Sequence, residues 1–483
     1  MTGAARTLSN AAIYGIGIVI NRGVTLALIA LYTRTLTMGE YADFELATTT
    51  IIFMTVLLDL GLNPALVRFC HMHEDMDLKD LFGTTVTFLT AWCAVLCGLA
   101  FAFQEQMSML VFGAGDKAML FALVAVDAAF TVLSNLPLAW LRARERSLQF
   151  MAINLVRAVV GPCAIAIFLF WMKWGLTGVI LGDICGLASL TLVGVFANAR
   201  WYRPVVRWAM LRPMLRFGLP LIPMGIGGAL LTVSDRYFLN AWVTKEELAV
   251  YGVAAKIGLM VVIVSQAIQT AYPPYAYRLA NEPEAPERFA DILRMLLAGM
   301  AAITVVITAA SNEILWVLAP QENYGGATAY VHWLALSFAC DGAALMVMTS
   351  LSIVHRTVLA SVIVGAAGIA KIVLSVLLIR TRGGIGAAEA TVLAYAVELA
   401  LTFWFTQRCY PVPHAWGKLA CLLGITIAAL YAASVALTWS IAPSLIARVA
   451  LVVAFAAVCA VTVFRPSERS EALRRIRRRL VGG

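Results

Sequence analysis

The stretch Val358–Ile379, VLASVIVGAAGIAKIVLSVLLI, is an apolar run with a single charged residue, Lys371. A helix of about 20 apolar residues is long enough to cross the hydrocarbon core of a membrane. A charge inside hydrocarbon costs about 2.5 to 3.5 kcal/mol on insertion scales, so such a side chain usually faces the protein interior or a wet cavity. The stretch therefore predicts a membrane-spanning helix that directs one charged side chain into the protein.

Stretches of this kind recur along the whole chain of 483 residues, which is 61% hydrophobic and only 13% charged. Soluble proteins carry about 25% charged residues. Every connection between the stretches is short, so we expect no soluble domain between them. The predicted fold is an all-α polytopic membrane protein of about 14 transmembrane helices, with cores at residues 11–33, 42–62, 82–103, 118–140, 148–170, 176–198, 214–241, 248–271, 289–310, 327–353, 358–379, 384–405, 418–438 and 444–464.

Several of these expected helices carry an ionisable residue well inside the apolar run. A polytopic protein with a charged, wet interior is suited to moving a polar substance, so the pattern indicates transport. The residues concerned are Arg22, Asp127, Arg157, Asp183, Asp235, Arg236, Lys256, Asp341, Lys371 and Glu398.

The remaining composition argues against several other classes of protein. The nine cysteines are scattered, with no spacing typical of zinc or of a disulfide framework, so we expect neither a metal nor a cofactor. No loop is large enough to carry a catalytic motif, so we expect no enzymatic activity and assign no catalytic residue. The net charge of +9 does not indicate nucleic-acid binding, because the positions of the arginines have a topological explanation.

The basic residues are distributed asymmetrically between alternate loops, and lysine and arginine favour cytoplasmic loops. If the N-terminus is cytoplasmic, the loops expected inside include the arginine-rich segment Arg200–Arg216 and the tail from Arg465. This asymmetry predicts that both termini are cytoplasmic and that the number of helices is even. The tail Arg465–Leu480 is expected to lie on anionic membrane lipids, the alternative being a helix that recruits a protein partner.

Two stretches of the chain repeat each other. Leu31–Ala47, LYTRTLTMGEYADFELA, aligns without gaps with Phe238–Ala254, FLNAWVTKEELAVYGVA, and each closes one expected helix and opens the next. Identical residues at matching places are Thr37 and Thr244, Glu40 and Glu247, Ala42 and Ala249, and Ala47 and Ala254.

The repeat predicts two lobes of six helices each, residues 1–206 and 207–410. Because six is even, both lobes enter the membrane in the same direction, and such repeats place a substrate site between them. Residues 411–483 would add two further helices and the basic cytoplasmic tail. These two helices are either a structural appendage or a groove for a lipid tail.

Three short motifs are similar to a known family pattern. They are Glu40-Tyr41-Ala42-x-Phe44 at the first repeated turn, LDLGL at Leu58–Leu62, and DRYFL at Asp235–Leu239. In these motifs the chain resembles the polysaccharide-transport branch, with its Wzx-type flippases, of the multidrug/oligosaccharidyl-lipid/polysaccharide exporter superfamily. The resemblance covers the whole chain, including the number of helices.

The resemblance implies two six-helix lobes in a V-shaped arrangement around a central cavity. It implies a flippase of the bacterial inner membrane that moves an undecaprenyl-diphosphate-linked oligosaccharide to the periplasmic leaflet by alternating access. The oligosaccharide would be an exopolysaccharide or a lipopolysaccharide O-antigen repeat unit. Coupling to H⁺ or Na⁺, and a polysaccharide polymerase and chain-length regulator as partners, are implied in the same way.

An anionic diphosphate crossing the membrane would need cations there, since arginine matches phosphate through its planar fork and lysine acts as a point charge. The alternative for each buried cation is an ion pair that pins helices within one lobe, and we prefer that alternative for Lys371 with Glu398. The expected substrate-binding residues are Arg22, Arg236, Lys256 and Arg157.

The acidic residues inside the helices are candidates for ion coupling, because a carboxylate in a partly dry cavity holds a proton more readily. The alternative is a capped or paired structural carboxylate, and Asp59, beside Gly61 and Pro64, would then simply form a turn. The expected ion-coupling residues are Asp59, Asp127, Asp235 and Asp341, with Asp183 as a further candidate.

The seventh expected helix contains Gly218, Pro220 and Pro223, so we predict that it is bent and serves as a hinge. Three other functions stay open. A lipid II flippase also has fourteen helices, but its usual N-terminal arginine–glycine motifs are not evident here. A cation-coupled multidrug exporter of the same superfamily typically has twelve. An integral membrane enzyme would need a larger catalytic loop.

Overall fold

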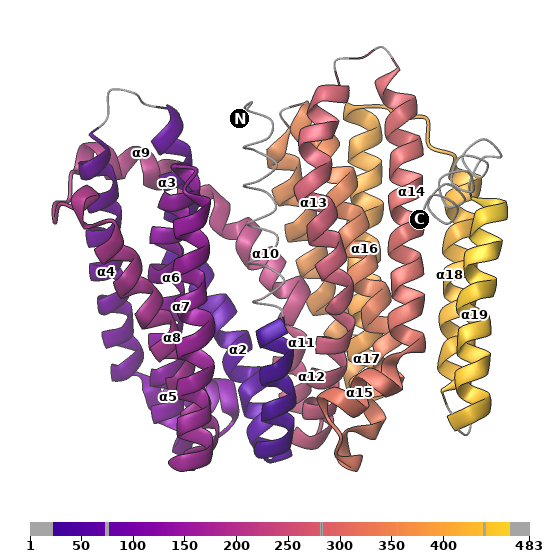
Figure 1. Cartoon of the computed structure of the whole chain (residues 1–483), viewed down its shortest axis with the longest axis horizontal. Helices are drawn as coiled ribbons and strands as arrows, with labels where there is room; N and C mark the ends of the chain where they lie inside the picture. Colours follow the sequence, from indigo (N-terminus) through magenta and orange to yellow (C-terminus); the bar gives the residue numbers. More distant parts are fainter. Residues whose placement is uncertain are drawn as a thin grey trace, which may run out of the picture. The chain divides into compact units, whose positions relative to one another are not determined.

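The computed structural model of the protein describes residues 23–72, 77–280, 282, 284–354, 356–437 and 441–463. All regular secondary structure in these ranges is helical (Figure 1). The α-helices are α2 (Met38–Asp59), α3 (Leu62–Met72), α4 (Leu78–Ala102), α5 (Gln104–Phe112), α6 (Ala118–Ala143), α7 (Ser147–Ala166), α8 (Gly175–Ala197), α9 (Trp208–Gly218), α10 (Ile222–Val233), α11 (Asp235–Trp242), α12 (Lys245–Gly258), α13 (Met260–Leu279), α14 (Ala285–Ala309), α15 (Ser311–Leu318), α16 (Thr328–Ile353), α17 (Thr357–Cys409), α18 (Trp416–Ala436) and α19 (Ile441–Thr462).

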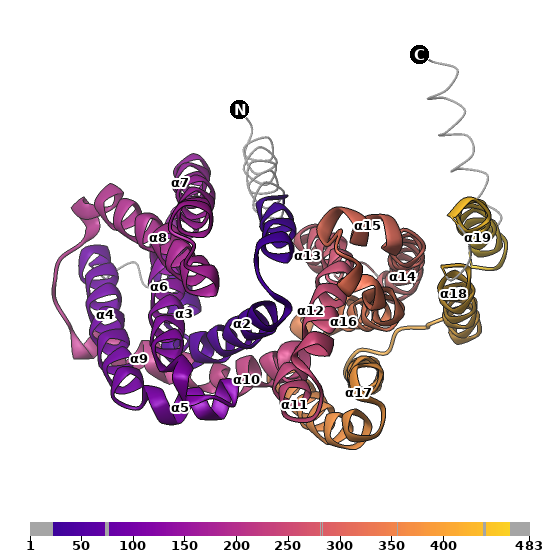
Figure 2. The ribbon, with the colours of Figure 1, turned by 90° about the horizontal axis from the view of Figure 1, so that it is seen from below.

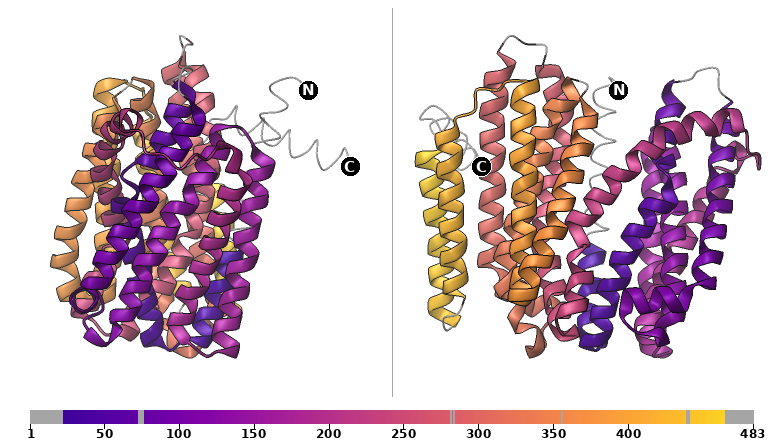
Figure 3. Two further views of the ribbon diagram at one scale, coloured as in Figure 1. Left: turned by 90° about the vertical axis from the view of Figure 1, so that its left-hand side faces the viewer. Right: turned by 180° about the vertical axis from the view of Figure 1, so that it is seen from behind.

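Twelve helical segments of the described chain are long and apolar enough to cross a membrane. One of them, Val358–Cys409, has 52 residues, about twice what a single crossing needs. Gly383 interrupts it with φ 57° and ψ −135°, so α17 consists of two spans joined by a turn (Figure 3). A helical stretch at residues 23–35 belongs to the first expected span. The predicted all-α polytopic fold is confirmed, and these segments account for the expected number of helices.

The chain divides into two compact units, Met1–Ala249 and Val250–Gly483. In the N-terminal unit α4, α6 and α8 run side by side, with α7 packed against α8 (Figures 1 and 2). The apolar core of this unit includes Leu66, Phe82, Trp140 and Leu211, which come from four different helices. The unit also contains α9 to α11, and α2 packs against both α6 and α10.

The C-terminal unit has α16 at its centre, packed against α13, α14 and α17. Helices α18 and α19 pair with each other and pack on α14, through an apolar cluster that includes Val305, Leu422 and Phe455. The division of the chain after residues 206 and 410, which the repeat suggests, stays a prediction.

The two repeated turns begin their helices in the same way. Thr37 Oγ1 accepts a hydrogen bond from the backbone N–H of Glu40 at 3.2 Å, and the Glu40 carboxylate accepts one from the N–H of Thr37 at 2.9 Å. Thr244 Oγ1 accepts from the N–H of Glu247 at 3.3 Å. A threonine three residues before a glutamate satisfies the free N–H groups of a helix start. The matched threonines, Thr37 and Thr244, therefore have a shared physical role, which is to open α2 and α12.

The seventh expected helix is broken into α9, α10 and α11. Pro220 lies in a 3₁₀ turn, Leu219–Leu221, between α9 and α10. Next to this break the backbone of Gly218 lies against that of Gly61, which has a left-handed φ of 68°. A Cβ atom on Gly218 would lie 2.3 Å from the carbonyl oxygen of Leu60. Glycine at these places is what allows the two segments to approach so closely.

Candidate functional site

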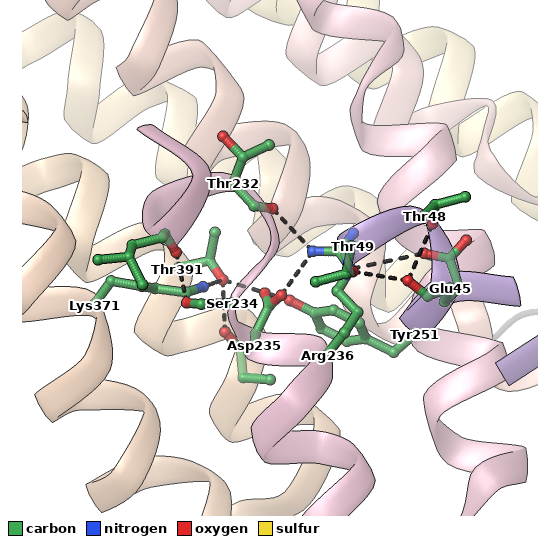
Figure 4. A network of polar contacts seen from close by, with 12 residues as sticks. Glu45, Thr48, Thr49, Thr232, Ser234, Asp235, Arg236, Tyr251, Lys371 and Thr391 are labelled. Atoms are coloured by element: carbon green, nitrogen blue, oxygen red, sulfur yellow. Dashed lines mark hydrogen bonds and ion pairs between the residues drawn. The ribbon is translucent and has the colours of Figure 1, made fainter. Parts of the chain in front are cut away.

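Arg236 lies in a buried ion cluster of the N-terminal unit. Its Nη1 donates to Asp235 Oδ1 at 2.7 Å and to the carbonyl of Thr232 at 2.9 Å, and its Nε lies 3.7 Å from Glu45 Oε2 (Figure 4). The side chains of Arg236, Asp235 and Glu45 are at most 4% exposed. Two carboxylates therefore surround one arginine. The geometry is that of an ion pair that pins helices together, since Glu45 belongs to α2 and both Asp235 and Arg236 belong to α11.

Helices α2 and α11 meet through further polar contacts. Thr50 Oγ1 lies 2.8 Å from the hydroxyl of Tyr237. Thr50 is five residues after Glu45 on α2, and Tyr237 directly follows Arg236 on α11. The hydroxyls of Thr48 and Thr49 donate to the carbonyl of Glu45, at 3.0 and 2.7 Å. These threonines satisfy their own hydrogen-bonding capacity within α2, so the helix can carry polar residues through an apolar environment.

Asp43, near the start of α2, binds two lysines. Lys117 Nζ donates to Asp43 Oδ2 at 2.5 Å, and Lys245 donates to Asp43 Oδ1. Asp43 is 7% exposed, whereas Lys117 and Lys245 are 26% and 32% exposed. One carboxylate thus joins the start of α2 to the start of α12 and to the turn before α6, with one positive charge in excess.

Arg157 and Asp127, predicted for different roles, belong to one group of charges in the N-terminal unit. Arg157 Nη2 lies 3.4 Å from Asp183 Oδ1, and both side chains are about two-fifths exposed. Asp127 is buried, accepts from Thr131 at 3.4 Å, and feels the charges of Asp183 and Arg157. Its Oδ2 has no hydrogen-bond partner among the described residues. The structure therefore brings a cation and two carboxylates from α6, α7 and α8 together.

The other predicted residues are dispersed. Asp59 accepts hydrogen bonds from the side chain and the backbone N–H of Asn63 across the turn between α2 and α3, the latter at 3.4 Å. This is the turn-forming arrangement. Lys256 is half-buried on α12, Asp341 lies on α16, and Arg22 lies outside the described residues.

Lys371 is fully buried in the C-terminal unit and donates to Thr391 Oγ1 (Figure 4). The hydroxyl of Tyr251 lies 3.4 Å from the same oxygen. The expected pair of Lys371 with Glu398 is not formed. Glu398 Oε2 has no hydrogen-bond partner among the described residues.

Some charged contacts of the structure were missed by the sequence analysis. Asp43 and Glu45 lie inside the span expected at residues 42–62, so the search for charges within apolar runs would have found them. Arg448 was not among the predicted residues, although it lies in the span expected at residues 444–464; it is 4% exposed within α19 and binds both oxygens of Glu313, at 2.7 and 2.8 Å. No local signal connects residues that lie 135 positions apart. The hydrogen bonds from Arg448 lower the pKa of Glu313.

An apolar cavity of about 390 Å³ lies in the C-terminal unit, lined by α14, α16, α17 and α18. Its walls include Leu297, Ala339, Phe403, Trp416 and Leu423. The cavity thus uses the first of the two additional helices as one wall. In the described part of the chain, no group of three or more His, Cys, Asp or Glu residues is placed to hold a metal ion.

The model of a family described as polysaccharide biosynthesis protein matches residues 7–279 of the chain. The protein belongs to this family. The match covers more than half of the chain, including the ion cluster around Arg236 and both repeated turns. No protein of curated function matches the sequence.

The fold of this polysaccharide biosynthesis family member is similar to that of several transporters. A lipid II flippase, MurJ, in an inward closed conformation has a TM-score of 0.71 and 14% identity, over 92% of this chain and 98% of that one. An inward-facing multidrug resistance MATE family transporter of the MOP superfamily has a TM-score of 0.60 and 13% identity, over 80% and 95%. A MATE transporter in the bent conformation has values of 0.59 and 13%, over 87% and 96%. The predicted superfamily fold is thereby confirmed.

Proposed function

We propose that the protein flips an undecaprenyl-diphosphate-linked oligosaccharide, an exopolysaccharide or O-antigen repeat unit, from the cytoplasmic to the periplasmic leaflet by alternating access. The observation that carries the proposal is membership of the polysaccharide biosynthesis family, combined with a transporter fold. A lipid II flippase shares that fold over nearly its whole length, which makes a lipid-linked glycan a suitable cargo class. The break between α9 and α10 would supply the hinge.

In this proposal the protein lies in the bacterial inner membrane with both termini in the cytoplasm. A polysaccharide polymerase and a chain-length regulator would act on the glycan after it is flipped. The two repeats of six helices, residues 1–206 and 207–410, would form the lobes of the transporter, with residues 411–483 added to them.

Among the described substrate-binding candidates, Arg157 and Lys256 are best suited to an anionic cargo. The side chain of Arg157 is 41% exposed and holds only one oxygen of Asp183, at 3.4 Å, so most of its donors are available for a phosphate. Lys256 is half-buried. Arg236 is enclosed by two carboxylates, which favours a structural role. Arg22 keeps its proposed role on sequence grounds.

We assign coupling to H⁺ or Na⁺ to the buried carboxylates, with Asp127 and Asp341 as the best-suited candidates. Asp127 has an oxygen without a hydrogen-bond partner among the described residues and lies beside Arg157 and Asp183. A proton bound there would change the charge that Arg157 experiences. Asp59 and Asp235 remain candidates with structural contacts of their own.

The apolar cavity beside α18 suits the polyisoprenyl tail of the proposed cargo. Its lining is almost wholly hydrocarbon and aromatic, so it would stabilise a chain through buried apolar area alone. This arrangement favours the groove over the structural appendage as the role of the additional helices.

Deletion of the gene, followed by mass spectrometry of the lipid-linked glycan pool, tests the proposal. We expect an oligosaccharide on undecaprenyl diphosphate to accumulate, and a plasmid copy to remove it. Accumulation of lipid II instead would identify a lipid II flippase, and increased sensitivity to drugs without any accumulated glycan would identify an exporter. A copy carrying Arg157→Ala should fail to restore export, whereas the matched control Arg382→Ala, at an exposed ion pair, should restore it.

A further inference from the structure

A buried polar stripe runs along the second half of α17. Thr391, Glu398, Thr402 and Thr406 are spaced by seven, four and four positions, which places them on one face of a helix. All four are at most 2% exposed. Buried polar groups within a membrane span are costly unless they are satisfied or serve a purpose. Thr391 and Thr402 are satisfied within the helix, because they donate to the carbonyls of Ala387 and Glu398 at 2.7 Å each. Glu398 is the ionisable member of the stripe.

Two neighbouring spans add polar residues to this interior with the same spacing. Lys371 and Ser375 are four residues apart in the first half of α17, and both are fully buried. Ser337, also fully buried, lies four residues before Asp341 on α16. The contact of Lys371 with Thr391 occupies one end of the stripe, seven residues before Glu398, which is about two helical turns.

The register of the helices brings Asp341 and Glu398 to the same level. The rings of Phe338 and Tyr395 lie 6.2 Å apart, which fixes α16 against the second half of α17. Two successive reversals of the chain, after α16 and at Gly383, make these two segments parallel. Asp341 lies three residues after Phe338, and Glu398 lies three residues after Tyr395. The ring contact and the shared spacing therefore place the two carboxyls on neighbouring helices, within electrostatic range of each other.

The basic side chains of the neighbouring helices α14 and α18 contact other groups. Arg294 of α14 pairs with Asp291 at 3.3 Å, and Lys418 of α18 donates to the carbonyl of Val463 at 3.4 Å. Arg278 lies near the end of α13. Cys340, the residue before Asp341, is a titratable group that lies near both carboxyls.

Glu398 Oε2 has no hydrogen-bond partner among the described residues. A buried carboxylate without a cation is strongly disfavoured, and two carboxyls side by side cannot both ionise readily. We propose that Asp341 and Glu398 share one proton and form a proton-binding site of the C-terminal unit. The proton resides as O–H on one carboxyl and is donated to the other, and it exchanges with water.

The stripe supplies the route for that exchange. Thr402 donates to the carbonyl of Glu398 at 2.7 Å, whereas Thr406, one turn further towards the end of α17, has an Oγ1 with no hydrogen-bond partner within the described ranges. A buried polar atom of this kind is a place for an ordered water. The role of the site in driving transport rests on the proposed function, whereas the binding of the proton does not.

Infrared difference spectroscopy of the full-length protein in nanodiscs tests the site. We expect a C=O stretching band of a protonated carboxylic acid at neutral pH that shifts in D₂O and is lost in Glu398→Gln. The matched control Glu389→Gln removes an ion-paired glutamate from the same helix and should leave the band intact. The proposal is overturned if the band survives in both Glu398→Gln and Asp341→Asn, or if Na⁺ at constant pH abolishes it.

A second variant distinguishes loss of the carboxyl from loss of the folded structure. Glu398→Asp retains a carboxyl, so it should retain a protonated band, and its absence in correctly folded protein would contradict a shared proton. Export of lipid-linked glycan in cells separates the two proposals. If the band behaves as expected but no glycan accumulates in the deletion strain, the proton site stands and the flippase function fails.

Discussion

Arg236 illustrates how a buried charge in a transporter has two opposite explanations. From sequence, it was a candidate for binding an anionic cargo or for pinning helices through an ion pair. In the structure it is 4% exposed, and it contacts Asp235 and Glu45. Breaking a buried ion pair by removing one partner costs about 3 to 5 kcal/mol, because the remaining charge is left uncompensated. A structural ion pair therefore predicts that replacing Arg236 lowers the stability of the fold, whereas cargo binding predicts a loss of export from a stable protein.

We expect Arg236→Met to reduce the thermal stability of the purified protein in detergent, by about 3 to 5 kcal/mol of unfolding free energy. The physical reason is the pair of buried carboxylates that it leaves behind. Glu45→Gln combined with Asp235→Asn in the same background should recover part of the loss. A stable Arg236→Met protein that merely fails to export glycan would instead favour cargo binding.

Glu313 provides a pH-dependent contribution at the residue scale. Hydrogen bonds from Arg448 lower its pKa in the folded state. The stabilisation is therefore complete above the ordinary pKa of a glutamate and is lost as the pH falls through the lowered pKa. We expect Glu313→Gln to lower the melting temperature at pH 7, and the difference from the unmodified protein to shrink below pH 4 or so. A difference that grows on acidification would contradict this account.

At the element scale, the number and type of the helices were predictable, because apolar runs of membrane length are written locally in the sequence. The break at Pro220 and the helix starts at Thr37 and Thr244 were signalled in the same local way. Contacts between distant segments were not predictable. Arg448 finds Glu313 and Lys371 finds Thr391 only because helices that are separate in sequence pack together.

The close approach of two backbones is the feature of the elements most sensitive to mutation. A Cβ on Gly218 would lie 2.3 Å from the Leu60 carbonyl oxygen, and backbone cannot yield as a flexible side chain does. We expect Gly218→Ala to destabilise the folded protein by about 1 to 3 kcal/mol, measured as loss of monodisperse protein on heating. Gly228→Ala is the matched control, because nothing lies within 4 Å of a Cβ there. Equal behaviour of the two variants would refute the contact.

At the scale of the whole molecule, the expected number of fourteen helices and the positions of the arginines predict the topology. We expect green fluorescent protein fused after Gly483 to fluoresce in cells and alkaline phosphatase fused there to be inactive, since the C-terminus is predicted to be cytoplasmic. A phosphatase fusion at Arg382, in a loop predicted outside, should be active. Active phosphatase at the C-terminus would show that one helix had been miscounted.

The central claim is that this polysaccharide biosynthesis family member moves a lipid-linked glycan between leaflets. The most direct test is the accessibility of that glycan to a membrane-impermeant reagent, such as a lectin or periodate, in spheroplasts with and without the protein. The account predicts that depletion makes the lipid-linked oligosaccharide inaccessible from outside, and that re-expression restores its modification within minutes. Equal accessibility in the presence and absence of the protein would contradict it.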